Sequence, residues 1–101
     1  MAFVKVGSVA ALPAGEVMEA EVNGDTYAIC NFAGELRAFE GVCPHAGGPL
    51  GQGTIEGDYL VCPWHAWQYD CRTGVNDYDG NTRLASFPVK AEGDDILIDI
   101  P

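Results

Sequence analysis

Two short segments of the chain each combine one cysteine with one histidine. The first reads Cys43-Pro44-His45 and the second reads Cys62-Pro63-Trp64-His65, with sixteen residues between His45 and Cys62. Both histidines of the chain lie in these segments. Thiolate sulfur and imidazole nitrogen are donors that zinc, copper and iron accept in proteins. The sequence therefore predicts a metal site formed by Cys43, His45, Cys62 and His65.

The spacing within the first segment bears on the number of metal atoms. A structural zinc ion accepts two thiolates and two imidazoles, but its paired ligands usually have about two to four residues between them. Cys43 and His45 have a single residue between them. In an extended backbone such residues lie about 6–7 Å apart at their Cα atoms, which suits two different metal atoms better than one. A two-iron cluster and a structural zinc ion both stay open at this point.

The four residues and their surroundings resemble the Rieske proteins, and specifically the soluble Rieske-type ferredoxins. The motif of that family is Cys-x-His followed, after a spacer, by Cys-x-x-His. Further matches are Gly47-Gly48-Pro49-Leu50, Tyr69-Asp70 and Thr73-Gly74. The resemblance extends over essentially the whole chain. It implies one [2Fe–2S] cluster per chain, with Cys43 and Cys62 on one iron and His45 and His65 on the other.

The resemblance also bears on the reduction potential, which spans about −150 to +300 mV in Rieske centres. High-potential members carry a further cysteine in each loop, joined as a disulfide, and a serine two residues after the second histidine. The corresponding positions here are Gly48, Trp64 and Trp67, whereas the family's tyrosine is kept as Tyr69. We therefore expect a potential in the low part of the range.

The elements that must position these segments are predicted to be short β-strands. Thirteen glycines and six prolines leave no twelve-residue window with a helical stripe of apolar residues. Asn23-Gly24 is a strong hairpin signal, because both residues tolerate positive φ. Alternating and β-branched runs predict strands at residues 3–6, 16–22, 26–32, 36–42, 54–56, 59–62, 68–70, 85–91 and 96–100.

Between these strands, residues 43–53 and 62–66 are predicted to be irregular loops, and residues 75–84 a polar irregular segment. The pattern predicts an all-β fold, as a small antiparallel sandwich or partly closed barrel. The two loops would form its cluster-binding subdomain, as in the Rieske fold. A length of 101 residues is typical of one domain, which we expect to span residues 1–101.

Five further residues have predicted places in the fold. Cys30 is expected in the core as a reduced thiol, whereas Cys71 follows a predicted strand and is expected to be partly exposed. Trp67 is expected in the core. Trp64 either shields the cluster, faces a partner or packs in the core, and Leu50 either covers the cluster or packs in the core.

The net charge of the chain restricts the classes of molecule that we expect it to bind. Five basic residues face fifteen acidic ones, which gives a formal net charge of −10. A field of this sign repels nucleic-acid phosphates and anionic lipid surfaces, so we expect neither partner. For the acidic excess itself, docking on proteins with basic patches and solubility alone both stay open. The sequence contains no apolar run long enough to cross a bilayer and no signal-peptide pattern at its start. The expected location is the cytoplasm.

These features favour a one-electron carrier over an enzyme. Both histidines belong to the predicted site, so none is left for the separate mononuclear iron of an oxygenase. The resemblance implies that the chain carries electrons from a flavoprotein reductase to a terminal oxygenase, docking at the edge formed by His45 and His65. Two alternatives stay open: a small Rieske subunit bound to the larger reductase subunit of a nitrite-reductase-type complex, and a structural zinc module that binds a protein partner.

Overall fold

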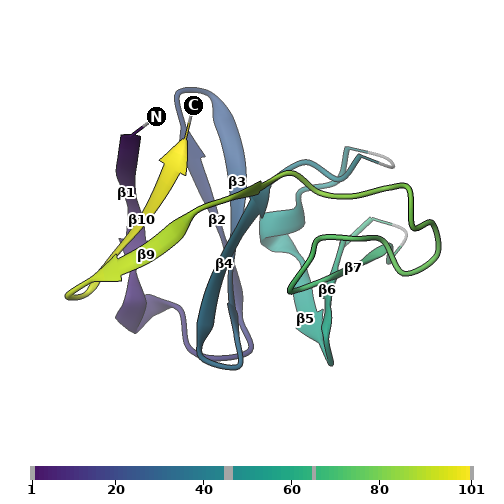
Figure 1. Cartoon of the computed structure of the whole chain (residues 1–101), viewed down its shortest axis with the longest axis horizontal. Coiled ribbons are helices and arrows are strands. Elements are labelled where there is room, and N and C mark those ends of the chain that lie inside the picture. Colours follow the sequence, from purple (N-terminus) through teal and green to yellow (C-terminus); the bar gives the residue numbers. More distant parts are fainter. Residues whose placement is uncertain (1, 45–46, 65, 101) are drawn as a thin grey trace.

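The computed structural model describes residues 2–44, 47–64 and 66–100. Within these ranges the chain forms strands and two short 3-10 turns, η1 (Val9–Ala11) and η2 (Leu50–Gln52) (Figure 1). The strands are β1 (Ala2–Ser8), β2 (Val17–Val22), β3 (Asp25–Phe32), β4 (Glu35–Glu40), β5 (Thr54–Glu56), β6 (Tyr59–Val61), β7 (Gln68–Asp70), β8 (Ser86–Phe87), β9 (Val89–Glu92) and β10 (Asp95–Ile100). They form three antiparallel sheets in the orders β1-β10-β9, β2-β3-β4-β8 and β5-β6-β7.

The sheet β2-β3-β4-β8 lies between the other two sheets and is covered on both faces. Successive side chains of a strand point to opposite faces. On β3, Ala28, Cys30 and Phe32 therefore contribute to one buried cluster, and Tyr27 and Ile29 contribute to another. This explains why β3 is apolar at consecutive positions instead of alternating with polar residues.

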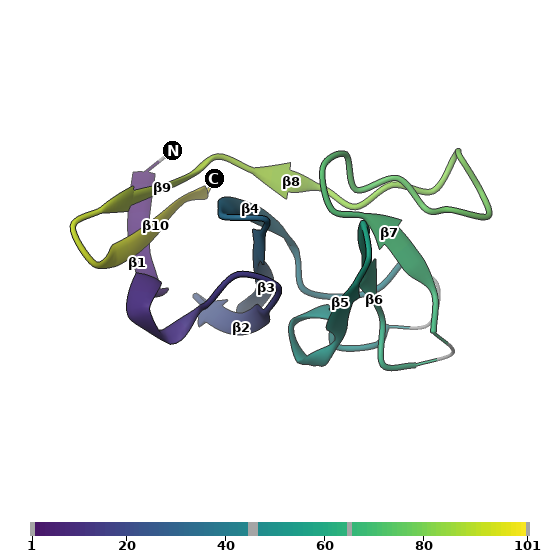
Figure 2. The ribbon, with the colours of Figure 1, turned by 90° about the horizontal axis from the view of Figure 1, so that it is seen from below.

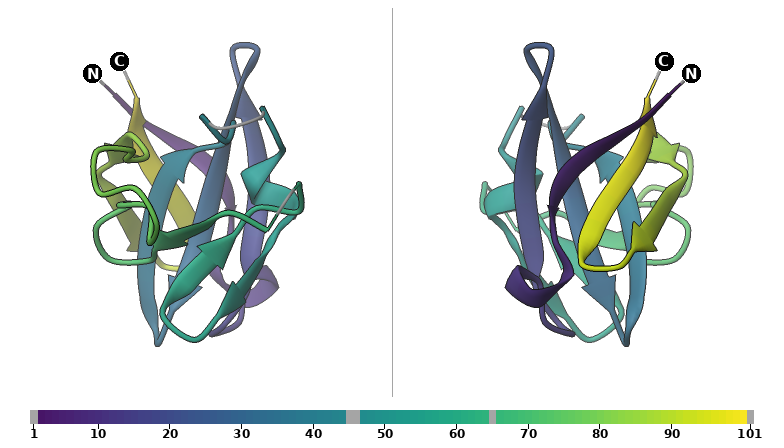
Figure 3. Two further views of the ribbon diagram at one scale, coloured as in Figure 1. Left: turned by 90° about the vertical axis from the view of Figure 1, so that its right-hand side faces the viewer. Right: turned by 90° about the vertical axis from the view of Figure 1, so that its left-hand side faces the viewer.

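Each outer sheet closes one of these two clusters. On β10, Ile96, Ile98 and Ile100 alternate inward and pack with the second cluster. The three-stranded sheet β5-β6-β7 contributes Leu60 and Tyr69 to the first cluster. Figure 2 shows β1, β9 and β10 at one end of the molecule and β5–β7 at the other. Figure 3 views the molecule from each of these two ends.

The structure confirms the all-β prediction and most predicted strands. The predicted hairpin forms at Asn23 and Gly24, which both have positive φ (55° and 88°), and the strands at 54–56 and 68–70 have their predicted bounds. The prediction of one strand over 85–91 is wrong, because it is divided into β8 and β9 at Pro88. Proline has no N–H group to donate to a strand partner. The chain thus leaves the middle sheet after β8 and joins the outer sheet as β9.

Candidate metal centre

The first predicted loop follows β4 after Gly41 and Val42, and it is closed by backbone hydrogen bonds. The N–H of Cys43 donates to the carbonyl of Gly48 (2.9 Å), and the N–H of Gly47 donates to the carbonyl of Cys43 (2.8 Å). Gly47 has a φ of 76°, a conformation that glycine adopts without strain. Outside this ring, Leu50 N–H donates to the carbonyl of Gly41 (3.0 Å). These bonds hold Cys43 at the base of the loop, where its side chain is buried.

The second predicted loop follows β6 and is closed in the same way. The N–H of Cys62 donates to the carbonyl of Trp67 (2.8 Å). The loop therefore starts at the end of β6 and returns to the start of β7, and Cys62 is buried at its base. Two of the four predicted ligands thus hold equivalent places, each at the start of its own loop.

The structure brings the two cysteine sulfurs together. Burial raises the pKa of the Cys62 thiol; the backbone N–H of Trp64 partly opposes this, and a hydrogen bond with the Cys43 thiol adds to the rise. A Cβ atom placed on Gly48 would lie 2.7 Å from Cys62 Sγ and 3.0 Å from Trp64 Cβ. The backbone of the first loop therefore passes directly over the sulfur of the second, which only glycine permits.

Tyr69, on β7, completes the surroundings of the sulfurs. Its hydroxyl oxygen lies 3.0 Å from Cys43 Sγ, at hydrogen-bonding distance. Burial is the main cause that raises the pKa of Tyr69 far above its usual range, and the hydrogen bond with Cys43 adds to it. The hydroxyl therefore keeps its proton, so it can only donate to Cys43 when that residue is a thiolate.

These observations fit the sulfur half of a Rieske cluster. Two adjacent thiols, withdrawn from solvent and supplied by two loops, are soft donors that an iron atom accepts once they lose their protons. His45 and His65 lie outside the described residues. Among the residues that are described, no group of three or more Cys, His, Asp and Glu could hold a metal ion. Completion of the donor set by the two histidines therefore stays a prediction.

The other residues with predicted places are all described. Cys30 and Leu50 are fully buried, as expected for core residues, and Trp67 packs against the core. Trp64 is 49% exposed, so it is not a core residue. The prediction for Cys71 is wrong: it is fully buried. Its N–H donates to the carbonyl of Asp58 in the β5–β6 turn (2.9 Å), and this bond draws the start of the following turn into the core.

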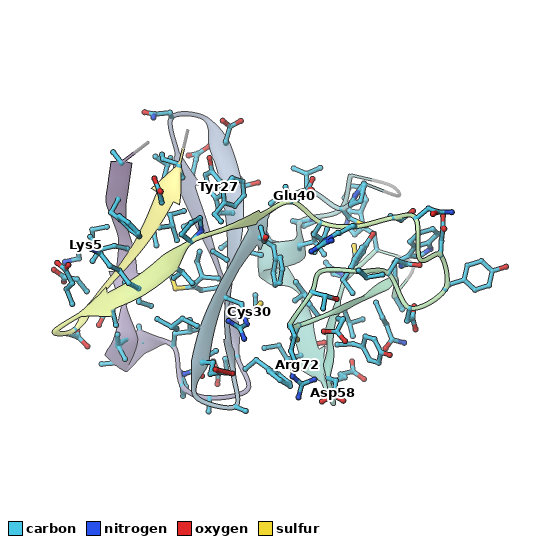
Figure 4. The ribbon with its side chains drawn as sticks, viewed as in Figure 1. Lys5, Tyr27, Cys30, Glu40, Asp58 and Arg72 are labelled. Atoms are coloured by element: carbon cyan, nitrogen blue, oxygen red, sulfur yellow. The ribbon has the colours of Figure 1, made fainter. Side chains whose placement is uncertain are left out.

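Two residues near the centre, Glu40 and Asn76, were not predicted from the sequence to have a role. Glu40, at the end of β4 (Figure 4), accepts a hydrogen bond from Ala85 N–H at 2.6 Å. Asn76 is only 4% exposed and organises the segment that the sequence marked as polar and irregular. Asn76 lies three residues before Asp79, a spacing typical of side chains that cap their own turn, and this was the available signal. The sequence contains no such signal for Glu40, because its hydrogen-bond partner Ala85 is forty-five residues away.

Comparisons with known proteins agree with this geometry. A family model described as the Rieske [2Fe-2S] domain matches residues 2–88. The ferredoxin component of biphenyl 2,3-dioxygenase from Rhodococcus jostii (strain RHA1) is 35% identical over 101 residues, covering 99% of this chain and 94% of the relative. The naphthalene 1,2-dioxygenase ferredoxin component from Pseudomonas aeruginosa is 31% identical over 90 residues, covering 88% and 86%.

The architecture also matches solved structures. The ferredoxin of Sphingomonas yanoikuyae B1 superposes with a TM-score of 0.87, covering 99% of this chain and all of the other at 24% identity. At that identity the likeness concerns the fold. Among the described residues, no helix is long and apolar enough to cross a membrane.

Proposed function

The chain belongs to the Rieske [2Fe-2S] family, and from that premise we propose that Cys43, His45, Cys62 and His65 are the ligands of its cluster. The cofactor is a Rieske [2Fe–2S] cluster. When bound, the cluster accepts and releases one electron at a time. The observation that carries the assignment of the sulfur ligands is that two buried cysteines from different loops lie in one cluster, close enough that Cys43 helps to raise the pKa of Cys62. The histidines are assigned by the family motif at their positions.

The chain transfers electrons as the ferredoxin component of a Rieske oxygenase system. In carbazole 1,9a-dioxygenase, a complex of reduced oxygenase and oxidised ferredoxin has been solved, and one of its chains superposes on this one with a TM-score of 0.83 at 22% identity, covering 95% and 91%. We propose that this chain likewise docks on a terminal oxygenase and receives its electron from a flavoprotein reductase. The edge that carries His45 and His65 would face both partners in turn.

Exposed apolar side chains support docking at this end of the molecule. Val42 precedes Cys43, Trp64 follows Cys62 two residues later, and each side chain is 49% exposed. Aromatic residues with one free face are typical centres of protein interfaces. The cytoplasm stays the proposed location, which cell fractionation would test. We also propose that residues 1–101 act as one domain, because β10, beyond the family match, pairs with β1 along most of its length.

The ligand assignment is tested by cofactor analysis of variants. The wild-type protein is expected to contain two irons and two sulfides per chain, and its dithionite-reduced form to give the paramagnetic spectrum of a cluster with mixed Cys and His ligation. Cys62→Ser and His65→Ala are each expected to lose this spectrum. Cys71→Ala is the matched control, because it removes a buried thiol outside the proposed ligand set. This variant should keep both the iron and sulfide content and the paramagnetic spectrum of the wild-type protein.

Two outcomes would contradict the assignment. A wild-type protein that binds one zinc ion and no sulfide would support the structural zinc module. A His65→Ala variant with an unchanged spectrum would exclude His65 as a ligand. Gel filtration from the native source separates a free carrier from a subunit that stays bound to a larger reductase.

A further inference from the structure

The segment between β7 and β8 lies at the same end of the molecule as the two cysteine loops. Figures 1 and 2 show this segment, coloured green, at the end of the molecule formed by β5–β7. A groove lies between this segment and the end of the second loop. It is lined by Ala66, Trp67, Gln68, Asn76, Asp77 and Tyr78. Ala66 directly follows His65 in the chain. The groove therefore adjoins the described end of the second loop.

The tip of the segment is held in one conformation by Asn76. Its side-chain oxygen accepts hydrogen bonds from the N–H groups of Tyr78 (3.0 Å) and Asp79 (2.6 Å). Its side-chain amide donates to the carbonyl of Gln68 on β7 (3.0 Å). A buried polar side chain with these three bonds fixes the turn to the sheet that carries Tyr69.

This ordered turn exposes a large aromatic side chain. Tyr78 is 91% exposed, far more than Phe3, Val42 or Trp64, the other exposed large apolar side chains among the described residues. Its backbone is anchored while its ring projects into solvent. A rigidly presented tyrosine provides contact area at a low cost in conformational entropy, as in many binding surfaces.

The charges around Tyr78 favour a cation as the group that contacts it. Asp77 lies in the groove beside Tyr78 and is exposed. The carboxylate of Asp79 is engaged within the turn, where it accepts from Asn81 N–H (3.0 Å) and Thr82 Oγ1 (2.9 Å). The guanidinium of Arg83 donates from Nε to the carbonyl of Thr73 (3.2 Å). The chain as a whole carries a net charge of −10.

We infer that Tyr78 and Asp77 form a docking site for an arginine or lysine side chain of the terminal oxygenase that accepts the electron. The cation would lie against the tyrosine ring while the carboxylate of Asp77 neutralises it. Because the groove adjoins the loop of Cys62 and His65, a partner held there would have its own centre next to the cluster. This inference rests on the proposed function and adds a contact outside the two ligand loops.

The test measures electron transfer from the reduced protein to an oxygenase in a stopped-flow instrument. The acceptor is the oxygenase component of biphenyl 2,3-dioxygenase from Rhodococcus jostii, whose own ferredoxin is 35% identical to this chain. Tyr78→Ala should lower the second-order rate constant about tenfold, as expected for an interface residue of major importance. Tyr78→Phe keeps the ring and should stay within about twofold of wild type. Asp77→Asn should lower the rate about threefold and weaken its dependence on salt.

Controls separate docking from the properties of the cluster. Phe3→Ala removes an exposed aromatic ring (42% exposed) from β1, in the outer sheet at the opposite end of the molecule, and should leave the rate unchanged. Oxidation by ferricyanide and the midpoint potential should be the same in all variants. Since Tyr78 makes almost no buried contact, its substitution should not alter folding.

The outcomes distinguish this inference from the proposed function. If wild type reduces the oxygenase and Tyr78→Ala does so equally fast, the docking site is refuted and the proposed function stands. If Tyr78→Ala also slows oxidation by ferricyanide, the residue acts on the centre and the docking site is again refuted. If wild type reacts with ferricyanide but not with the oxygenase, the proposed acceptor fails, and the docking site fails with it.

Discussion

Tyr69 shows how one side chain links the core of this protein to its electron carrier. It is fully buried, and it pairs with Leu60 across β6 and β7, so sheet register and packing both orient its ring. Its hydroxyl lies 3.0 Å from Cys43 Sγ, and burial keeps the hydroxyl protonated. A donated hydrogen bond stabilises a thiolate more when negative charge on the cluster rises. Tyr69 should therefore make the cluster easier to reduce.

We predict that Tyr69→Phe lowers the midpoint potential by about 60 mV. This is a tenfold change in a one-electron equilibrium, and it corresponds to the loss of one hydrogen bond to a charged group. Redox titration followed by visible absorbance measures it. Tyr59→Phe is a suitable control because Tyr59 lies on β6 opposite Asp70, outside the first buried cluster. An unchanged potential in Tyr69→Phe would show that the hydroxyl does not donate to the cluster ligand.

Cys30 gives a pH prediction at the same scale. Burial raises its pKa from 9.0 to about 12, and the nearby Cys71 adds to the rise. A raised pKa in the folded state means that folding favours the neutral thiol. The resulting stabilisation is complete below about pH 9 and is lost as the pH rises through the pKa of the folded state.

We therefore expect the free energy of unfolding to fall between pH 9 and pH 12, and Cys30→Ala to remove part of that fall. Urea unfolding at pH 8 and at pH 11 measures the difference. For Cys71, burial raises the pKa only to about 11, so Cys71→Ala should remove a smaller part. A fall of equal size in wild type and Cys30→Ala would exclude the titration of Cys30 as its cause.

At the scale of elements, the centre depends on two loops that cross at one point. Each loop is closed by hydrogen bonds of its own backbone, which hold Cys43 and Cys62 at the base of their loops. They meet where Gly48 passes over the sulfur of Cys62. The high proline and glycine content of these loops predicted that they are irregular. The same content permits the close approach of the Gly48 backbone to Cys62 Sγ.

Gly48→Ala should damage the centre without touching a ligand. Its Cβ would lie 2.7 Å from Cys62 Sγ, so the sulfur or the loop must move. We expect a clearly lower iron content and a loss of about 1–3 kcal/mol in the free energy of unfolding, as is typical of overpacking. Gly80→Ala is the matched control, because a Cβ there meets nothing within 4 Å. Equal iron content in the two variants would contradict the close approach.

At the scale of the whole molecule, one end of the fold supports the metal centre and the other end completes the hydrophobic core of the domain. The sheet β1-β10-β9 and the middle sheet enclose one buried cluster, and the middle sheet and β5-β6-β7 enclose the other, which contains Cys43, Cys62 and Tyr69. The first buried cluster thus supports the centre, while the second completes the domain. The acidic excess of ten charges acts on both ends at long range.

This charge predicts opposite salt effects on two electron acceptors. With the oxygenase, which we expect to present basic groups, the second-order rate should fall on the order of tenfold between low and physiological ionic strength. With ferricyanide, an anion that the protein repels, it should rise. Stopped-flow measurements across a salt series give both slopes. A rate with the oxygenase that is independent of salt would show that the acidic surface does not steer docking.

Local sequence patterns predicted the fold class and most strands correctly, and they supplied the four proposed ligands. Alternation and turn residues act between near neighbours, as at Asn23-Gly24, so strands and hairpins are readable from local order. The ligand motif is equally local, because each loop carries its own cysteine and histidine. The sequence could not place Cys71, whose burial depends on a hydrogen bond to Asp58 thirteen residues away.

How the two cysteine loops meet could not be predicted from the sequence, because it depends on contacts between distant elements. The contact between the two thiols, the bond from Tyr69 and the anchoring of the Tyr78 turn by Asn76 all join residues on different elements. Such contacts depend on how the sheets pack, and packing is set by the summed burial of many side chains from distant parts of the chain. A local sequence pattern does not report this packing. The type of metal centre could therefore be predicted from the sequence, but the arrangement of its residues could not.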